Sequence, residues 1–167
     1  MKTDYELITE ALQNGVEADW EEYALLIDSF PDGQNMLTGD HWINDAIAIG
    51  SVASVKWMVS KNVNLDICDA GFTPVLSVLD REGEERYELL EFLLQNKAPV
   101  NAKGGNDWTP LHKAAVAEDL RAMDILLQYG ADPNIRTEID DYATPLEEAR
   151  HLGKMEAVRF LENYSKA

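Results

Sequence analysis

A short motif that recurs at nearly constant spacing constrains the fold of this chain more than any other feature of its sequence. A threonine followed by a proline opens the three clearest copies, and these threonines are 36 and 35 residues apart. An apolar residue marks a later point of each unit, at spacings of 33, 35, 33 and 35 residues. Five units of about 34 residues therefore cover nearly the whole chain, which indicates a repeat architecture. The motif copies begin at Thr73, Thr109 and Thr144, and the apolar markers are Leu25, Met58, Leu93, Leu126 and Leu161.

The unit around Thr109 shows what each repeat is expected to form. Thr109 can cap the free N–H groups at the start of a helix, and Pro110 suits the first helical position, where a missing N–H costs little. Residues 120–127 place their leucines and methionine at helical spacing, and Gly130 supplies a stop for that helix. Each unit is thus helix, turn, helix and hairpin loop. Because one such unit cannot bury its own apolar face, the units must stack.

Two stretches of this unit closely resemble the ankyrin repeat: residues 105–115, Gly-Asn-Asp-Trp-Thr-Pro-Leu-His-Lys-Ala-Ala, and residues 126–134, Leu-Leu-Gln-Tyr-Gly-Ala-Asp-Pro-Asn. The resemblance implies an all-α fold, an ankyrin-repeat solenoid of about five helix-turn-helix units joined by hairpin loops. The unit at residue 41 departs from the family, with His-Trp-Ile-Asn where Thr-Pro-Leu-His is usual. We expect one domain over 1–167, with an N-terminal capping unit at 1–33 (helices near 4–14 and 19–30), repeats at 34–68, 69–103 and 104–138, and a closing cap at 139–167.

The net charge of −17 is concentrated at the N-terminal end of the chain. Residues 1–50 contain eleven acidic residues and one basic residue, which leaves −10 in the first third. Such a field repels phosphate backbones, so we expect no direct binding of nucleic acid. It attracts a basic protein and speeds the encounter with it. The alternative is that the charge serves solubility alone.

Composition also bounds the class and the compartment of the protein. A hydrophobic fraction of 46% is normal for a folded globular domain. The longest apolar run, residues 46–53, falls far short of the roughly 20 residues that a membrane span needs. The single cysteine, Cys68, allows no internal disulfide, and the N-terminus carries no secretory pattern. We therefore expect a soluble cytoplasmic protein that does not associate with membranes and is a monomer when unbound.

The sequence offers no constellation for catalysis or for metal binding. The three histidines are not at zinc-ligand spacing, and the chain has neither a phosphate-binding glycine loop nor a nucleophile elbow. The acidic run 136–142 lacks the alternating pattern of a calcium loop. His112 occupies the motif position at which the family's histidine bonds neighbouring backbone. We expect no enzymatic activity, no cofactor and no metal.

The resemblance implies that a partner binds the concave face, which is built from hairpin tips and first helices. The residue before each motif threonine then lies at a hairpin tip, and two of these residues, Phe72 and Trp108, are aromatic. A rigid aromatic side chain at such a position is typical of a binding anchor, although packing against the adjacent hairpin is the alternative. Trp42, at the usual proline position, either joins this surface or caps its helix. The remaining tip residues by the same register are Asp40, Asp69, Lys103, Asn106, Asp140, Asp141 and Tyr142.

Two further departures bear on binding. The exposed ends of the first helices carry apolar residues, Ile49, Val116 and Leu152, beside Asp80, which suggests a partly apolar strip flanked by acids. The second clear unit also has three extra residues near 80–86, either a binding loop or a tolerated surface insertion.

These features together predict a non-catalytic module that binds one basic protein partner through its concave face. Small acidic chains of this kind also look like the immunity proteins with which bacteria neutralise toxins, which suggests an inhibitor. The alternative is a general adaptor or assembly scaffold with several partners.

Overall fold

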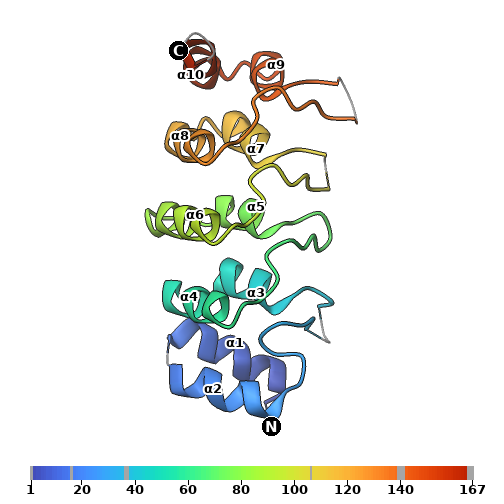
Figure 1. Cartoon of the computed structure of the whole chain (residues 1–167), viewed down its shortest axis with the longest axis vertical. Coiled ribbons are helices and arrows are strands. Elements are labelled where there is room, and N and C mark those ends of the chain that lie inside the picture. The colour runs from blue at the N-terminus through green and yellow to red at the C-terminus, as the bar shows by residue number, and fades with distance from the viewer. Residues whose placement is uncertain (1, 16, 36–37, 106, 139–141, 165–167) are drawn as a thin grey trace.

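The computed structural model describes residues 2–15, 17–35, 38–105, 107–138 and 142–164, and within them the fold is a stack of antiparallel helix pairs (Figure 1). The predicted all-α solenoid is confirmed. No helix among these residues is long and apolar enough to cross a membrane. The helices are α1 (Asp4–Asn14), α2 (Glu17–Leu26), α3 (Trp42–Ile49), α4 (Val52–Ser60), α5 (Pro74–Leu79), α6 (Glu85–Gln95), α7 (Pro110–Val116), α8 (Leu120–Gln128), α9 (Pro145–His151) and α10 (Met155–Tyr164).

The loops that follow α4, α6 and α8 project to the same side of the stack, next to the first helix of each later pair (Figure 1). The second helices form the opposite layer. We call the surface formed by these loops and by α3, α5, α7 and α9 the hairpin face, and it is the surface on which sequence reasoning placed the partner.

Side-chain caps fix where the first helices begin. The hydroxyls of Thr73, Thr109 and Thr144 each accept a hydrogen bond from the backbone N–H three residues later, and a proline follows each of them. The predicted role of the motif threonine is confirmed. Thr3 caps α1 in the same way, with Glu6 completing a capping box, and α1 spans the expected residues.

The second helix of the first pair is shorter than expected. It ends at Leu26 rather than near residue 30. Phe30 precedes Pro31, and a residue before proline is disfavoured in the helical conformation. The chain turns instead, and the ring of Phe30 packs against Trp42 and Trp57, with centroids 5.6 Å away in each case.

Trp42 belongs to this buried aromatic cluster and not to the binding surface. Its side chain is only 3% exposed, and its indole N–H donates to Ser29 Oγ at 3.3 Å. Its ring also lies 6.1 Å from that of Tyr5 in α1. The interpretation of Trp42 as a partner-binding residue is therefore wrong, because the indole fills the space between the first helix pair and the second. The residue before α3, His41, makes no side-chain cap.

The longer turn of the third helix pair lies where the sequence placed it. Residues 80–84 join α5 to α6, whereas residues 117–119 join α7 to α8. Arg81 in this turn reaches back to the preceding pair and donates to the carbonyl oxygens of Ile47 and Gly50 at the end of α3. The insertion thus contacts the adjacent repeat.

Candidate partner-binding surface

The two predicted aromatic anchors lie side by side on the hairpin face. Phe72 is 47% exposed, whereas Trp108 is half-buried. Both line a small cavity of about 120 Å³ between adjacent hairpins. The ammonium of Lys113, from α7, stands over the ring of Phe72 at 5.6 Å from its centroid. Phe72 is therefore the more accessible of the two.

Glycines allow these hairpins to approach closely. Gly105 N–H donates to the carbonyl oxygen of Gly71 at 2.9 Å. A Cβ added to Gly71 would lie 2.6 Å from Gly105 Cα, and Gly71 also has a left-handed φ of 90°. Only glycine satisfies both conditions without strain. The contact brings Phe72 and Trp108, 36 residues apart in sequence, to one surface.

Asp69 does not lie at an exposed tip. It is 8% exposed, and its carboxylate accepts hydrogen bonds from His41 and from Asn44 Nδ2, the latter at 2.8 Å. Burial opposes its ionisation, but the hydrogen bonds from His41 and Asn44 outweigh that effect and lower the pKa of Asp69. The expectation of an exposed tip is wrong for Asp69, because its polar atoms bind the preceding repeat, although the residue lies in the lining of the hollow between α3 and α5.

Lys103 also makes contacts within the solenoid. Its ammonium lies 2.9 Å from Asp107 Oδ2 and donates to the carbonyl oxygen of Arg136 in the next hairpin at 3.0 Å. The hydrogen bond to Asp107 raises the pKa of Lys103. The side chain is half-buried, so it connects two hairpins on the surface where we predicted a partner contact.

Among the remaining predicted tip residues, the structure describes Tyr142 and Asp40. Tyr142 is 59% exposed and has a left-handed φ of 56°, the conformation that Gly39 and Gly71 adopt at the equivalent place. Asp40 is half-buried beside α3. The predicted contacts Asn106, Asp140 and Asp141 lie outside the described residues.

The apolar strip predicted along the first helices is present in part. Ile49 and Leu152 are exposed. Asp80, which occupies the comparable position of a repeat between theirs, is exposed as well. Val116 is half-buried. Three of these four positions are therefore apolar and one is acidic.

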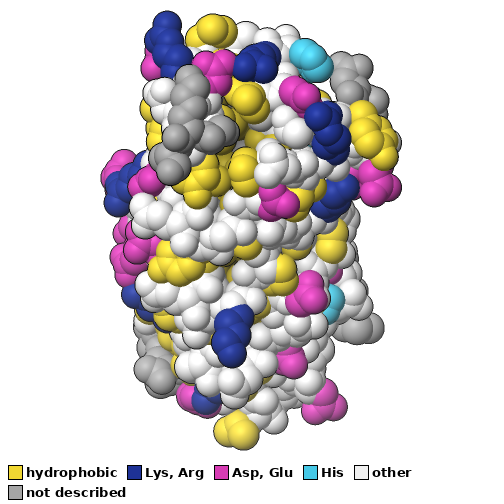
Figure 2. Space-filling view, turned by 45° about the horizontal axis from the view of Figure 1, so that its top comes forward, with side chains coloured by type: hydrophobic (Ala, Val, Ile, Leu, Met, Phe, Trp, Pro, Cys, Tyr) yellow, Lys and Arg dark blue, Asp and Glu magenta, His cyan; other side chains and the backbone are white. Residues whose placement is uncertain are grey.

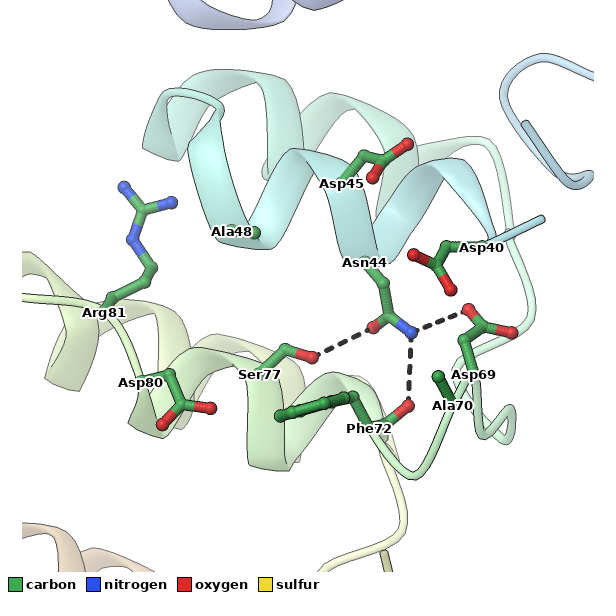
Figure 3. Close-up of a pocket in the computed structure, with 10 residues that line it drawn as sticks. All are labelled: Asp40, Asn44, Asp45, Ala48, Asp69, Ala70, Phe72, Ser77, Asp80 and Arg81. Carbon is green, nitrogen blue, oxygen red and sulfur yellow. Dashed lines mark hydrogen bonds between the residues drawn. The ribbon is translucent and has the colours of Figure 1, made fainter. Parts of the chain in front are cut away.

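The hairpin face also contains a hollow between α3 and α5, which sequence reasoning missed. It has a volume of about 460 Å³ (Figure 3). Phe72 forms its lower side in this view, and Asp40 and Asp45 lie on the α3 side above. Register alone identified Phe72, Asp40, Asp69 and Asp80 of this lining but not Asp45. The one available indication was a single acidic residue inside the apolar helix α3.

Asp45 is held in an unfavourable setting for a carboxylate. Burial raises its pKa, the amide of Asn35 opposes the rise by donating to Oδ2 at 2.8 Å, and the negative charges of Asp40 and Asp69 add to the rise. Among the described residues, no ion pair forms at Asp45 or at Asp40. Asp40 and Asp45 therefore bring negative charge to the hollow without a direct ion-pair partner in the described part of the chain.

Elsewhere most cations of the chain are already paired. At least ten of the 14 Lys and Arg residues form ion pairs with carboxylates of this chain, which leaves much of the acidic surplus without an internal counter-charge. Figure 2 shows acidic side chains at the margins and also within the visible face, several of them beside a basic one. The acidic surplus therefore attracts positively charged molecules in solution.

His112 has the structural role that its motif position indicated. It is fully buried, its Nδ1 lies 2.8 Å from Thr109 Oγ1, and its Nε2 lies 3.1 Å from the carbonyl oxygen of Ala143 in the next hairpin. Burial lowers the pKa of His112, which favours the neutral imidazole. The ring connects two repeats.

A stack of helix pairs with a row of hairpins along one side defines a helical repeat protein. Comparison with known sequences gives the family: a family model described as ankyrin repeats (3 copies) matches residues 43–137 and 81–166. This chain belongs to the ankyrin-repeat family. Ankyrin repeats mediate protein–protein interactions, and the family is typically non-catalytic.

Curated relatives match this chain over part of their own length. The chain is 30% identical over 134 residues to a protein of Arabidopsis thaliana that carries the name E3 ubiquitin-protein ligase XBAT34, covering 78% of this chain and 35% of that protein. It is 32% identical over 96 residues to alpha-latrotoxin-Lg1a of Latrodectus geometricus, covering 56% and 7%. It is 31% identical over 100 residues to an ankyrin repeat protein of Rickettsia bellii, covering 59% and 39%. The chain thus spans well under half of each relative.

Proposed function

We propose that this protein is a non-catalytic interaction module that binds one basic protein partner through its hairpin face, the concave face of the solenoid. The observation that carries the proposal is the hollow between α3 and α5. There an exposed aromatic ring, Phe72, stands beside the carboxylates of Asp40 and Asp45, which no cation of the described chain neutralises.

An aromatic anchor and an unpaired charge contribute differently to such an interface. Burying the exposed part of Phe72 contributes affinity, because aromatic side chains in desolvated pockets are typical hot spots. The acidic surplus speeds encounter and selects a partner of opposite charge. The charge favours a basic protein, and its excess lies in residues 1–50, at the N-terminal end of the stack.

The test is affinity capture from the native host with matched variants. The wild-type chain is expected to retain one basic protein, and Phe72→Ala is expected to lose it. Tyr164→Ala is the control, because Tyr164 is 45% exposed, close to the value for Phe72, but lies on α10 in the outer layer. Raising the salt concentration is expected to weaken capture, since exposed charges are screened.

The result also separates two roles for the complex. A tight complex of fixed stoichiometry that abolishes the partner's own activity supports an inhibitor. Several weaker partners that keep their activity support an adaptor. Capture of an acidic or neutral partner, or capture that Phe72→Ala leaves unchanged, contradicts the proposal itself.

A further inference from the structure

The hollow between α3 and α5 has the size and the walls of a side-chain pocket. Its volume of about 460 Å³ lies within the range of about 300–1,000 Å³ that is usual for ligand sites. Ala48 and the ring of Phe72 supply apolar surface, and Asp40 and Asp45 supply negative charge (Figure 3). A ligand that fits must therefore combine an apolar or aromatic-stacking body with a positive charge.

Two of the charged groups around the hollow are already occupied. Asp69 accepts hydrogen bonds from His41 and Asn44, and Asp80 pairs with Lys113 at 2.5 Å. Arg81 lines the hollow as well, but its guanidinium donates to two carbonyl oxygens at the end of α3. Asp40 and Asp45 are thus the two carboxylates of the hollow that form no ion pair among the described residues, and the positive charge of Arg81 lies at another part of its lining.

The ring of Phe72 has one side open to this hollow. Phe72 lines both the large hollow and the smaller cavity that it shares with Trp108, whereas Lys113 lines only the smaller one. The ammonium of Lys113 lies 5.6 Å from the ring centroid and pairs with Asp80. Because Phe72 also borders the large hollow, a cation that enters the hollow meets aromatic surface, and a cation over an aromatic face is attracted by the ring quadrupole.

We propose that this hollow binds the guanidinium of an arginine side chain of the partner, stacked on Phe72 and paired with the carboxylates of Asp40 and Asp45. This inference rests on the proposed function and names the side chain by which the partner is recognised. Arginine fits better than lysine, because its planar guanidinium stacks on an aromatic ring and bonds carboxylates with two parallel N–H groups. Lysine offers a compact, strongly hydrated point charge.

The setting of Asp45 gives independent support. The ionised carboxylate of Asp45 is half-buried beside the carboxylates of Asp40 and Asp69, so its charge lowers the stability of the fold. In natural proteins, such locally unfavourable residues are expected at functional sites. A guanidinium in the hollow would supply the missing counter-charge.

The test uses the whole chain and three capped tripeptides as probes: acetyl-Gly-Arg-Gly-amide, its citrulline twin, which has the same shape without the charge, and its lysine counterpart. Binding is followed by amide chemical shifts in an NMR titration. The arginine peptide is expected to bind with a Kd on the order of 1 mM and to shift the side-chain amide of Asn44 and the backbone amide of Phe72. The citrulline and lysine peptides are expected to bind about fivefold more weakly or worse.

Three variants locate the site. Asp45→Asn is expected to remove the shifts, and Phe72→Leu, which keeps an apolar side chain without an aromatic face, is expected to weaken binding about fivefold. Asp124→Asn makes the same charge change on the outer helix α8 and is expected to have no effect.

Equal binding of the arginine and citrulline peptides overturns the inference, as do shifts spread evenly over the acidic surface or binding that survives Asp45→Asn. If the peptide fails to bind while capture of a basic protein still depends on Phe72, the arginine pocket is wrong and the proposed function stands. If capture is also independent of Phe72, both are wrong.

Discussion

The carboxylate of Asp69 holds His41 of the preceding repeat by two contacts of 2.8 Å, one to the backbone N–H and one to ring Nδ1. The two residues are 28 positions apart. Asp69 also accepts from Asn44, so one buried side chain joins the hairpin before α5 to the start of α3. In a solenoid each repeat contacts only its neighbours, so such a contact carries part of the coupling between them.

Replacing Asp69 with alanine is expected to destabilise the protein by about 2–3 kcal/mol, because it leaves the N–H of His41 and the amide of Asn44 without their charged acceptor. The free energy of unfolding, measured by urea denaturation, tests this. Asp66→Ala, an exposed acid three residues away, is the control and is expected to change stability by less than about 0.5 kcal/mol. Equal effects of the two changes would show that the contact contributes nothing.

The contribution of Asp69 is expected to depend on pH in a defined direction. Its pKa is lowered in the folded state, so its stabilising effect is fully present above the unfolded value of about 3.9. The effect is lost as pH falls through the lower folded pKa. The stability difference between wild type and Asp69→Ala should therefore be constant near neutral pH and shrink below about pH 4. A difference that grows on acidification would contradict this sign.

Asp45→Asn is expected to change stability in the opposite direction. The folded-state pKa of Asp45 is raised, so the ionised carboxylate weakens the fold at every pH above that value and has no cost below the unfolded pKa. An asparagine keeps an acceptor for the Asn35 amide. The variant should be more stable than wild type by about 0.5–1 kcal/mol at pH 7, with the advantage vanishing near pH 3. Loss of stability at pH 7 would contradict the prediction.

The glycine contact between hairpins can be separated from backbone strain. Gly71→Ala and Gly83→Ala both place alanine at a left-handed φ, 90° and 83°, which costs about 1–2 kcal/mol. Only at position 71 would the new Cβ meet a neighbour, at 2.6 Å from Gly105, whereas nothing lies within 4 Å at position 83. Gly71→Ala should therefore lower the midpoint of thermal unfolding clearly more than Gly83→Ala. Equal shifts would mean that the hairpins move apart without cost.

Tyr142→Gly is expected to stabilise the protein by about 0.5–1 kcal/mol, because a bulky residue at a φ of 56° is strained and glycine is not. Asp107 occupies the equivalent place with a φ of 58°. Asp107→Gly is expected to destabilise instead, since it removes the pairing with Lys103 and the hydrogen bond from the N–H of Glu138. Thermal unfolding of both variants tests the contrast, and a stabilised Asp107→Gly would show that strain outweighs these contacts.

For most residues of the candidate site, the sequence predicted only which position of the repeat each residue occupies. Register placed Phe72 and Asp80 on the surface, and both are exposed. The same register also placed Asp69 and Trp42 there, and both are buried. Register reports which part of the repeat a residue occupies, but exposure depends on what the neighbouring repeat places against it. For Asp69 that neighbour is His41, and for Trp42 it is the aromatic cluster with Phe30.

The sequence by itself determined the stack of helix pairs and the starts of the helices after Thr73, Thr109 and Thr144. These depend on hydrogen bonds between residues three positions apart and on the fixed φ of proline, so they are local. Only the tertiary structure decided that Asp45, Asp40 and Phe72 border one hollow and that Asp45 keeps an unneutralised charge there. Those properties arise from burial and from charges contributed by two repeats at once, which no local pattern encodes.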